Sequence, residues 1–108
     1  MSGFYRFPAM AKLGELTNQQ QASKLLDECA EAEKALLVYE VVALDEIETG
    51  HVDCISDSSV ARTAYGMELM DVIHAAETAL RMEFSDVEAD ELRAEVEDKN
   101  RKRGYYQL

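Results

Sequence analysis

Pairs of acidic residues spaced three apart are the most frequent pattern in this chain that could do chemistry. Such residues lie side by side on a helix. Most of them fit a solvated face, because 22 acidic residues stand against 11 Lys and Arg and the formal net charge is −11. Two pairs differ, because their neighbours around a helix are apolar: Glu28 with Glu31, and Glu68 with Asp71.

The pair Glu68 and Asp71 lies in the middle of a stripe of small and apolar residues when the segment is turned by about 100° per residue. Because Ala64 and Ala75 flank the two acids, the sequence predicts a hollow lined by carboxylates where a larger side chain would have filled the core. Such a hollow indicates a bound cation. The opposite side of this segment is expected to face solvent or a partner, and it carries Thr63, His74, Glu77 and Arg81.

The pair Glu28 and Glu31 also has mainly apolar neighbours, among them Ala32, and is expected to face inward. An uncompensated buried carboxylate costs several kcal/mol, so four of them in one small domain require a neutralising ion. Ligands that are all oxygen favour Mg²⁺, with Mn²⁺ or Ca²⁺ as alternatives. The other interpretation is that one pair is partly exposed and the other forms an ion pair with Lys24 or Arg103.

A basic cluster at 99–103 stands out in this acidic chain, because it holds four of the eleven basic residues. The apolar residues Leu92 and Val96 continue at helical spacing to Lys99 and Arg103, which are therefore expected on the inner side of a bundle. Arg101 and Lys102 are expected to point outward. Opposite a divalent ion, Lys99 and Arg103 would bind the remaining oxygens of a phosphate chain, with Asn100 as a neutral donor. The alternative is that these cations offset the dipole at the end of a helix.

Signals for helix starts and ends divide the chain into three predicted helices. A Ser or Thr followed three residues later by Glu or Gln forms a capping box, and this pattern occurs at Thr17 with Gln20 and at Ser85 with Glu88. Gly104 is the residue type favoured just past a helix end. The predicted helices cover residues 17–48, 58–84 and 86–103. Residues 56–59 contain the candidate caps of the middle helix. The sequence does not determine whether the first helix breaks near Val42.

The composition favours a single all-α domain over residues 1–108. Pro8 is the one proline, so the rest of the chain lacks the strongest helix breaker. The negative charge argues against binding of nucleic acid or an anionic membrane surface, and no apolar run approaches the roughly 18 residues of a membrane span. Cys29 and Cys54 form no CxxC pair, and the start of the chain does not have the pattern of a signal peptide, so a cytoplasmic location is expected.

The middle segment has a second apolar side, formed by Met67, Met70 and Ile73. On a small acidic domain such a patch predicts a homodimer or a homotetramer. Gly66 is a poor helix residue and is expected to mark close backbone packing. The patch also supports the main alternative function, a non-catalytic helical-bundle interaction protein, since it explains association without chemistry. A nucleotide-sensing protein is a further alternative.

The acidic pairs, their order and the basic end together resemble the MazG-like family of all-α nucleoside-triphosphate pyrophosphohydrolases. The family signature is an ExxE pair on one helix and an ExxD pair on a later one, which here are residues 28–31 (Glu-Cys-Ala-Glu) and 68–71 (Glu-Leu-Met-Asp). Residues 99–106 resemble the closing segment of small phage-type members. The segment 32–67 between the pairs is longer than the family usually shows.

The resemblance implies an oligomeric helical bundle that hydrolyses a nucleoside triphosphate to a monophosphate and pyrophosphate with Mg²⁺, a housekeeping activity on the nucleotide pool. Glu28, Glu31, Glu68 and Asp71 would hold the ion. Glu31 and Glu68 would be the catalytic carboxylates, with the choice of the base left open. The residues expected to bind substrate are Gln21, Lys99, Asn100 and Arg103.

Overall fold

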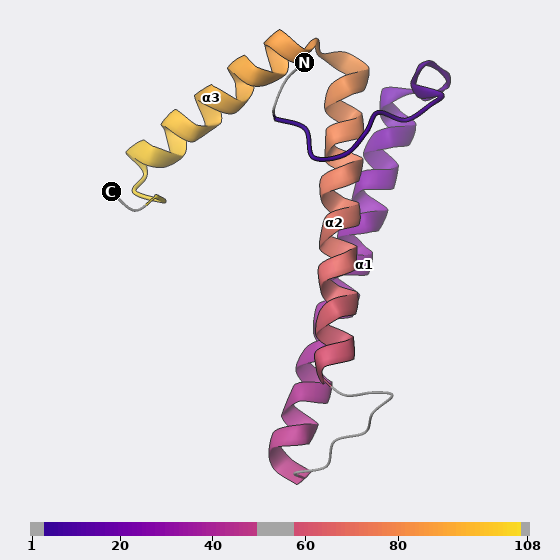
Figure 1. Ribbon diagram of the computed structural model, residues 1–108, viewed down its shortest axis with the longest axis vertical. Helices are drawn as coiled ribbons and strands as arrows, with labels where there is room; N and C mark the ends of the chain where they lie inside the picture. Colours follow the sequence, from indigo (N-terminus) through magenta and orange to yellow (C-terminus); the bar gives the residue numbers. More distant parts are fainter. Residues whose placement is uncertain (1–3, 50–57, 107–108) are drawn as a thin grey trace.

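The chain is all-helical, as the sequence predicts. The computed structural model describes residues 4–49 and 58–106 (Figure 1). Within these two ranges no strand occurs, and no helix is both long and apolar enough to cross a membrane. The elements in chain order are the 3₁₀ turn η1 (Leu13–Glu15), α1 (Asn18–Thr49), α2 (Ser58–Glu83) and α3 (Asp86–Lys102).

Both predicted capping boxes are present, and each helix begins and ends within one residue of its expected bounds. At the start of α1, the Thr17 N–H donates to Gln20 Oε1 at 3.0 Å, and the Gln20 N–H donates to Thr17 Oγ1 at 3.1 Å. Ser85 and Glu88 make the same pair of bonds before α3, and these bonds hold the pKa of Glu88 below its usual range. Gly104 follows α3 with φ +78°, a conformation that glycine adopts without steric cost.

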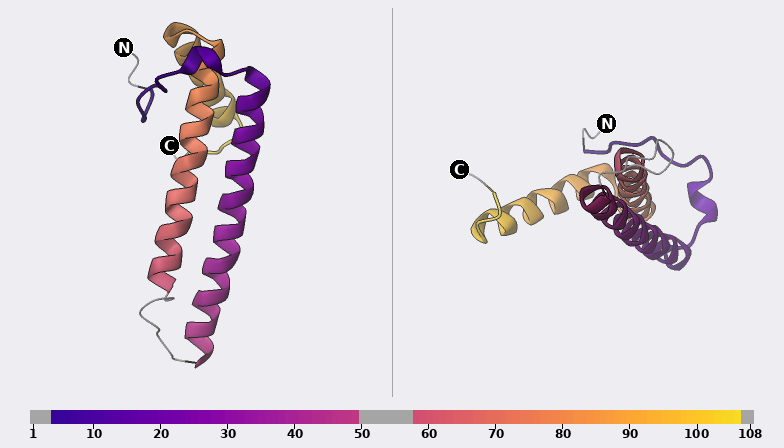
Figure 2. Two further views of the ribbon diagram at one scale, coloured as in Figure 1. Left: turned by 90° about the vertical axis from the view of Figure 1, so that its right-hand side faces the viewer. Right: turned by 90° about the horizontal axis from the view of Figure 1, so that it is seen from below.

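The two long helices α1 and α2 form an antiparallel hairpin that contains most of the packing (Figures 1 and 2). The helix α1 runs for 32 residues without a break at Val42. Near its end, the Glu46 carboxylate accepts hydrogen bonds from the backbone N–H and the hydroxyl of Ser58, both at 2.6 Å. A carboxylate at a helix N-terminus also interacts favourably with the helix dipole. Glu46 therefore holds the first turn of α2, while the candidate caps at 56–57 lie outside the described residues.

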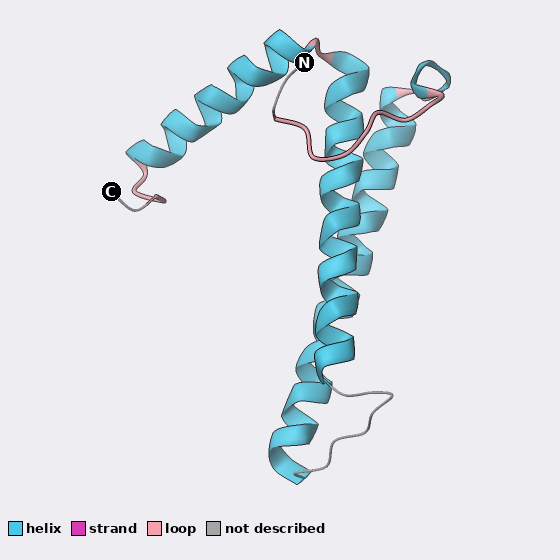
Figure 3. Cartoon of the chain, in the orientation of Figure 1, coloured by secondary structure: helices cyan, strands magenta, loops and turns pink. Residues whose placement is uncertain are grey.

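The helix α3 leaves the hairpin at the turn after α2 and extends away from it (Figures 1 and 3). Residues 4–10, which we call the N-terminal segment, contact α3 through Phe4. Ala89 is buried, and the Arg93 guanidinium lies 5.7 Å from the centre of the Phe4 ring. The second half of α3 is mostly exposed. In the described chain, α3 therefore does not form a third layer along the hairpin.

The N-terminal segment covers a side of α2 that was expected to face solvent or a partner. Glu77 is only 5% exposed, and its two carboxylate oxygens accept the backbone N–H groups of Arg6 and Phe7, each at 2.9 Å. The guanidinium of Arg81 lies 3.9 Å from the centre of the Tyr5 ring. This side of α2 therefore faces neither solvent nor a partner chain at Glu77 and Arg81, because the irregular N-terminal segment needs acceptors for its backbone N–H groups and finds them in the Glu77 carboxylate.

The apolar core within one chain is small. Its buried hydrophobic residues are Ala32, Ala75 and Ala89, and no large side chain among the described residues is fully buried. Met67 is 65% exposed. A methyl group added at Gly66 would meet nothing within 4 Å, so the expected close packing at Gly66 is absent from the single chain. So little apolar burial leaves little to offset the conformational entropy of folding.

Candidate metal centre

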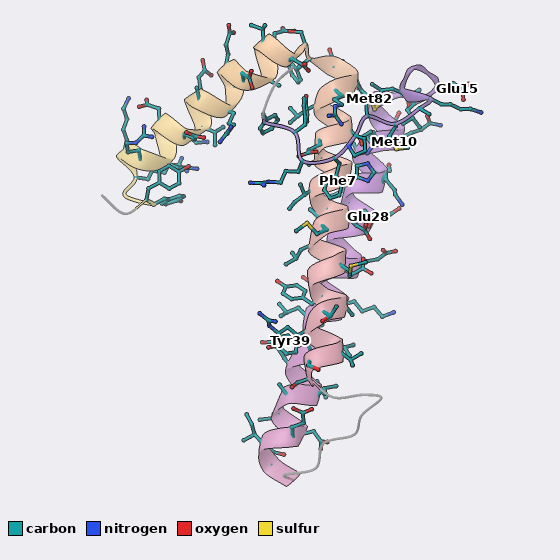
Figure 4. The ribbon with its side chains drawn as sticks, viewed as in Figure 1. Phe7, Met10, Glu15, Glu28, Tyr39 and Met82 are labelled. Carbon is teal, nitrogen blue, oxygen red and sulfur yellow. The ribbon has the colours of Figure 1, made fainter. Side chains whose placement is uncertain are left out.

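Three carboxylates from both helices of the hairpin converge. Glu28 comes from α1, while Glu68 and Asp71 come from successive turns of α2. Each contributes one oxygen to a group in which all three oxygens lie within 4.8 Å of one another. We call these three residues the carboxylate cluster. Figure 4 marks the position of Glu28 on the hairpin.

Glu31, the fourth predicted carboxylate, lies beside the cluster. It is exposed, and its negative charge is one of those that act on Glu68. Burial raises the pKa of Glu68, and the negative charges of Glu31, Asp71 and Glu28 raise it further. The structure thus brings all four carboxylates into one electrostatic environment. The expectation that both pairs face inward is wrong for Glu31 and Asp71, which are exposed at the edge of the two-helix interface, whereas Glu28 is buried.

Two oxygens of the cluster are buried without a hydrogen-bond donor, namely Oε2 of Glu28 and Oε2 of Glu68. Glu28 as a whole is only 6% exposed. A buried carboxylate oxygen with no partner carries a desolvation cost that a cation would remove. Because every atom here that could bind a metal ion is a carboxylate oxygen, the residues suit Mg²⁺, Mn²⁺ or Ca²⁺.

Lys24 supplies one positive charge to this region. Its Nζ lies 2.7 Å from Glu28 Oε1, one turn away along α1, and its side chain is largely exposed. The hydrogen bond to Glu28 and the charge of that carboxylate raise the pKa of Lys24. The ion pair with Lys24 considered in the sequence analysis is therefore present for Glu28. A single ammonium group does not balance the charge of four neighbouring carboxylates.

A cavity of about 290 Å³ opens beside the cluster, with Glu28 and Asp71 in its wall. Gln21 also lines this cavity; it is buried, and its Nε2 donates to the backbone carbonyl of Ala75 at 3.0 Å. The hydrogen bond fixes the orientation of the Gln21 amide. The sequence placed Gln21 near a substrate, and the structure places it in the wall of the cavity.

Three further residues line the cavity but were not predicted from the sequence to belong to the site: Met10, His74 and Thr78. His74 and Thr78 follow Asp71 by three and seven residues, which puts both near the face of Asp71. The expectation that His74 faces solvent or a partner is therefore wrong, because His74 is half-buried in the cavity wall. The Thr78 hydroxyl donates to the His74 carbonyl at 3.0 Å. Helical spacing could not identify Met10, because Met10 lies outside the helices, on the N-terminal segment, and lines the cavity only because this segment packs across the hairpin.

The predicted phosphate-binding residues Lys99, Asn100 and Arg103 do not lie at the carboxylate cluster in the single chain. Lys99 and Arg103 are exposed, and the Asn100 amide donates to the Tyr106 hydroxyl at 3.4 Å. The expectation that Lys99 and Arg103 face the interior of the bundle is wrong for the single chain. The physical reason is the direction of α3, which extends away from the hairpin after Ser85 instead of folding back along it.

Comparisons with protein-family models, with curated proteins and with solved structures found no match to this chain. Its function is therefore inferred from the carboxylate cluster, the adjoining cavity and the residues that position them.

Proposed function

We propose that this chain is a Mg²⁺-dependent nucleoside-triphosphate pyrophosphohydrolase, as its resemblance to the MazG-like family implies. The observation that carries the proposal is the carboxylate cluster, in which two buried oxygens have no hydrogen-bond donor. Mn²⁺ is an alternative ion. The products would be a nucleoside monophosphate and pyrophosphate, and the substrate is a metabolite of the cytoplasm, where we expect the protein to act.

Glu28, Glu68 and Asp71 would hold the ion through one oxygen each. When bound, Mg²⁺ would offset the charge of the phosphate chain and polarise its phosphorus–oxygen bonds. Gln21 supports this arrangement, because its hydrogen bond to Ala75 joins the helix of Glu28 to the helix of Asp71.

Glu31 is the carboxylate best placed to act as the general base. It lies outside the group of three, it is exposed to solvent, and it is close enough for its negative charge to raise the pKa of Glu68. In this position Glu31 would take the proton of the attacking water. Glu68 would act beside Glu31 as an oxygen ligand of the ion.

The base of the nucleotide would enter the cavity beside Gln21, and its phosphates would lie at the carboxylates. Lys24 is the cation in the cavity wall. Lys99, Asn100 and Arg103 would reach the phosphates from a second copy of the chain, since α3 extends away from its own hairpin. Cations opposite the carboxylates would stabilise the charge that develops on the leaving group.

We also propose that the chain works as a homodimer or a homotetramer. The hairpin leaves Met67, Met70 and Ile73 on α2 exposed, and Val41 and Ile47 on α1 are exposed as well. Two such hairpins can bury these side chains by forming a four-helix bundle. Assembly would give the chain the core that one copy lacks.

The test is a screen of purified protein against the common ribo- and deoxyribonucleoside triphosphates with Mg²⁺, followed by measurement of pyrophosphate release. Glu68→Gln and Asp71→Asn should each abolish release from the best substrate without loss of helical circular dichroism, because each removes a charged ligand atom. Glu31→Gln should slow turnover by about 100-fold or more, the range expected for loss of a general base.

The matched control is Glu91→Gln, which changes an exposed carboxylate on α3 in the same way. Glu88→Gln is a weaker control, because the Glu88 carboxylate accepts the Ser85 N–H in the capping box. Loss of activity in Glu91→Gln equal to that in Glu68→Gln would contradict the assignment. An inactive parent protein would favour the alternative, a helical interaction protein that associates through its apolar faces.

A further inference from the structure

The N-terminal segment supplies part of the wall of the cavity beside the carboxylate cluster. Met10 lines the cavity directly. The ring of Phe7 lies 4.9 Å from the ring of His74, another residue of the wall, with 30° between the ring planes. Figure 4 shows Phe7 and Met10 on the segment where it crosses the hairpin. The shape of the cavity therefore depends on how this segment is held.

Glu77 holds the segment through two hydrogen bonds to its backbone. Its Oε2 accepts the Arg6 N–H and its Oε1 accepts the Phe7 N–H, both at 2.9 Å, and the residue is nearly completely buried. Because both oxygens act as acceptors, a carboxylate suits this position and an amide does not. The contact of the Arg81 guanidinium with the Tyr5 ring adds a second attachment beside it.

We propose that Glu77 is a positioning residue for the nucleotide base. By holding the N-terminal segment across α2, it keeps Met10 in the cavity wall and keeps the ring of Phe7 packed on His74. Met10 and His74 then form an apolar and aromatic wall against which a planar ring can pack. This inference rests on the proposed function and specifies its substrate class. The wall favours a substrate that carries a planar base, whereas inorganic polyphosphate would bind through its phosphates alone.

The size of the cavity supports this assignment. Its volume of about 290 Å³ lies at the lower end of the range for small-molecule sites. A cavity of this size suits the ring of a nucleotide better than the whole molecule, so the phosphates would extend to Glu28 and Asp71 at its edge. The base and the phosphates would then contact separate sets of residues, which makes their contributions separable by experiment.

The test is Glu77→Gln, which keeps the size of the side chain but points an NH₂ group at one of the two backbone N–H groups. Hydrogen exchange at the amides of Arg6 and Phe7 should become at least about tenfold faster. KM for the best nucleoside triphosphate should rise about tenfold, with kcat changed by less than about twofold, because ground-state and transition-state contacts to the base are lost alike. KM for inorganic tripolyphosphate, which has no base, should stay the same.

Two variants serve as comparisons. Glu77→Asp keeps two acceptor oxygens and should recover part of the nucleotide affinity. Glu83→Gln changes another hydrogen-bonded carboxylate on α2, which accepts the Asn18 side-chain amide at 2.7 Å. Glu83 does not line the cavity, so this variant should leave both KM values unchanged. If Glu77→Gln fails to fold, Phe7→Ala gives the second test, since it leaves Glu77 and its backbone partners intact and should raise only the nucleotide KM.

An equal rise of KM for the nucleotide and for tripolyphosphate would overturn the inference, and so would an unchanged nucleotide KM despite faster amide exchange. A fall in kcat alone would also overturn it, because it would place Glu77 in the chemical step. Failure of the proposed function is recognised separately. In that case the parent protein itself turns over neither compound, and the inference falls with the function on which it rests.

Discussion

Gln21 on α1 donates from its Nε2 to the backbone carbonyl oxygen of Ala75 on α2, at 3.0 Å across the hairpin. Both residues are 6% exposed. Glu28 lies two turns after Gln21 on α1, and Asp71 lies one turn before Ala75 on α2. This hydrogen bond therefore fixes the separation of the two helices close to the place where their carboxylates meet.

Gln21→Ala should lower the free energy of unfolding by about 1–3 kcal/mol, because it removes a buried hydrogen bond and leaves a small cavity. Urea denaturation followed by circular dichroism measures the change, at one fixed protein concentration because of the proposed assembly. Gln19→Ala is the control, since Gln19 is exposed on the same turn and should change stability by less than about 0.5 kcal/mol. Equal losses in both variants would contradict the structural role of the bond.

Mg²⁺ should raise the midpoint of thermal unfolding. In its absence the four carboxylates repel one another, and binding to the folded state alone stabilises that state. Melts with EDTA and with millimolar Mg²⁺ measure the difference, and Asp71→Asn should reduce it because the cluster loses a charged ligand. Coincident midpoints in the parent protein would show that the cluster binds no metal in the free protein.

The protein should be a dimer or a tetramer at micromolar concentration, because the apolar side formed by Met67, Met70 and Ile73 is exposed in one chain. Light scattering after size-exclusion chromatography measures the mass. Met67→Asp should shift the mass towards the monomer, since it places a charge within the patch. Ser23→Asp adds the same charge at an exposed site on α1 and should have no effect. A parent mass of 12.1 kDa would contradict assembly.

The cations at the end of α3 should differ in their effect on turnover. Arg101 and Lys102 are paired with Asp98, at 4.0 and 3.0 Å. Lys99 and Arg103 have no carboxylate within ion-pair distance among the described residues, so their charge is available to phosphates.

Lys99→Ala and Arg103→Ala should therefore weaken substrate binding or turnover, while Arg101→Ala and Lys102→Ala should be nearly silent. Steady-state kinetics on the best nucleoside triphosphate compares the four variants. Similar losses in all four would mean that the end of α3 acts only through its total charge.

The sequence by itself determined the features that depend on neighbours within one helix. The capping residues Thr17 and Ser85 form hydrogen bonds three residues away, so the helix starts could be recognised from residue types alone. Helical spacing likewise put Glu68 and Asp71 on one face of α2. Of the two alanines expected to flank a hollow there, Ala75 lies in the cavity wall, whereas Ala64 is exposed and does not line it.

Only the tertiary structure decided what lies against each face and where α3 goes. Glu77 was expected to face solvent or a partner, yet it is buried and bonded to backbone N–H groups 71 and 70 residues away in the same chain. Met10 reaches the cavity by the same path. Lys99 and Arg103 have the spacing of an inner face, but the turn after α2 sends α3 away from the hairpin. Periodicity specifies the face of a helix on which a residue lies, whereas contacts between segments distant in the chain decide what covers that face.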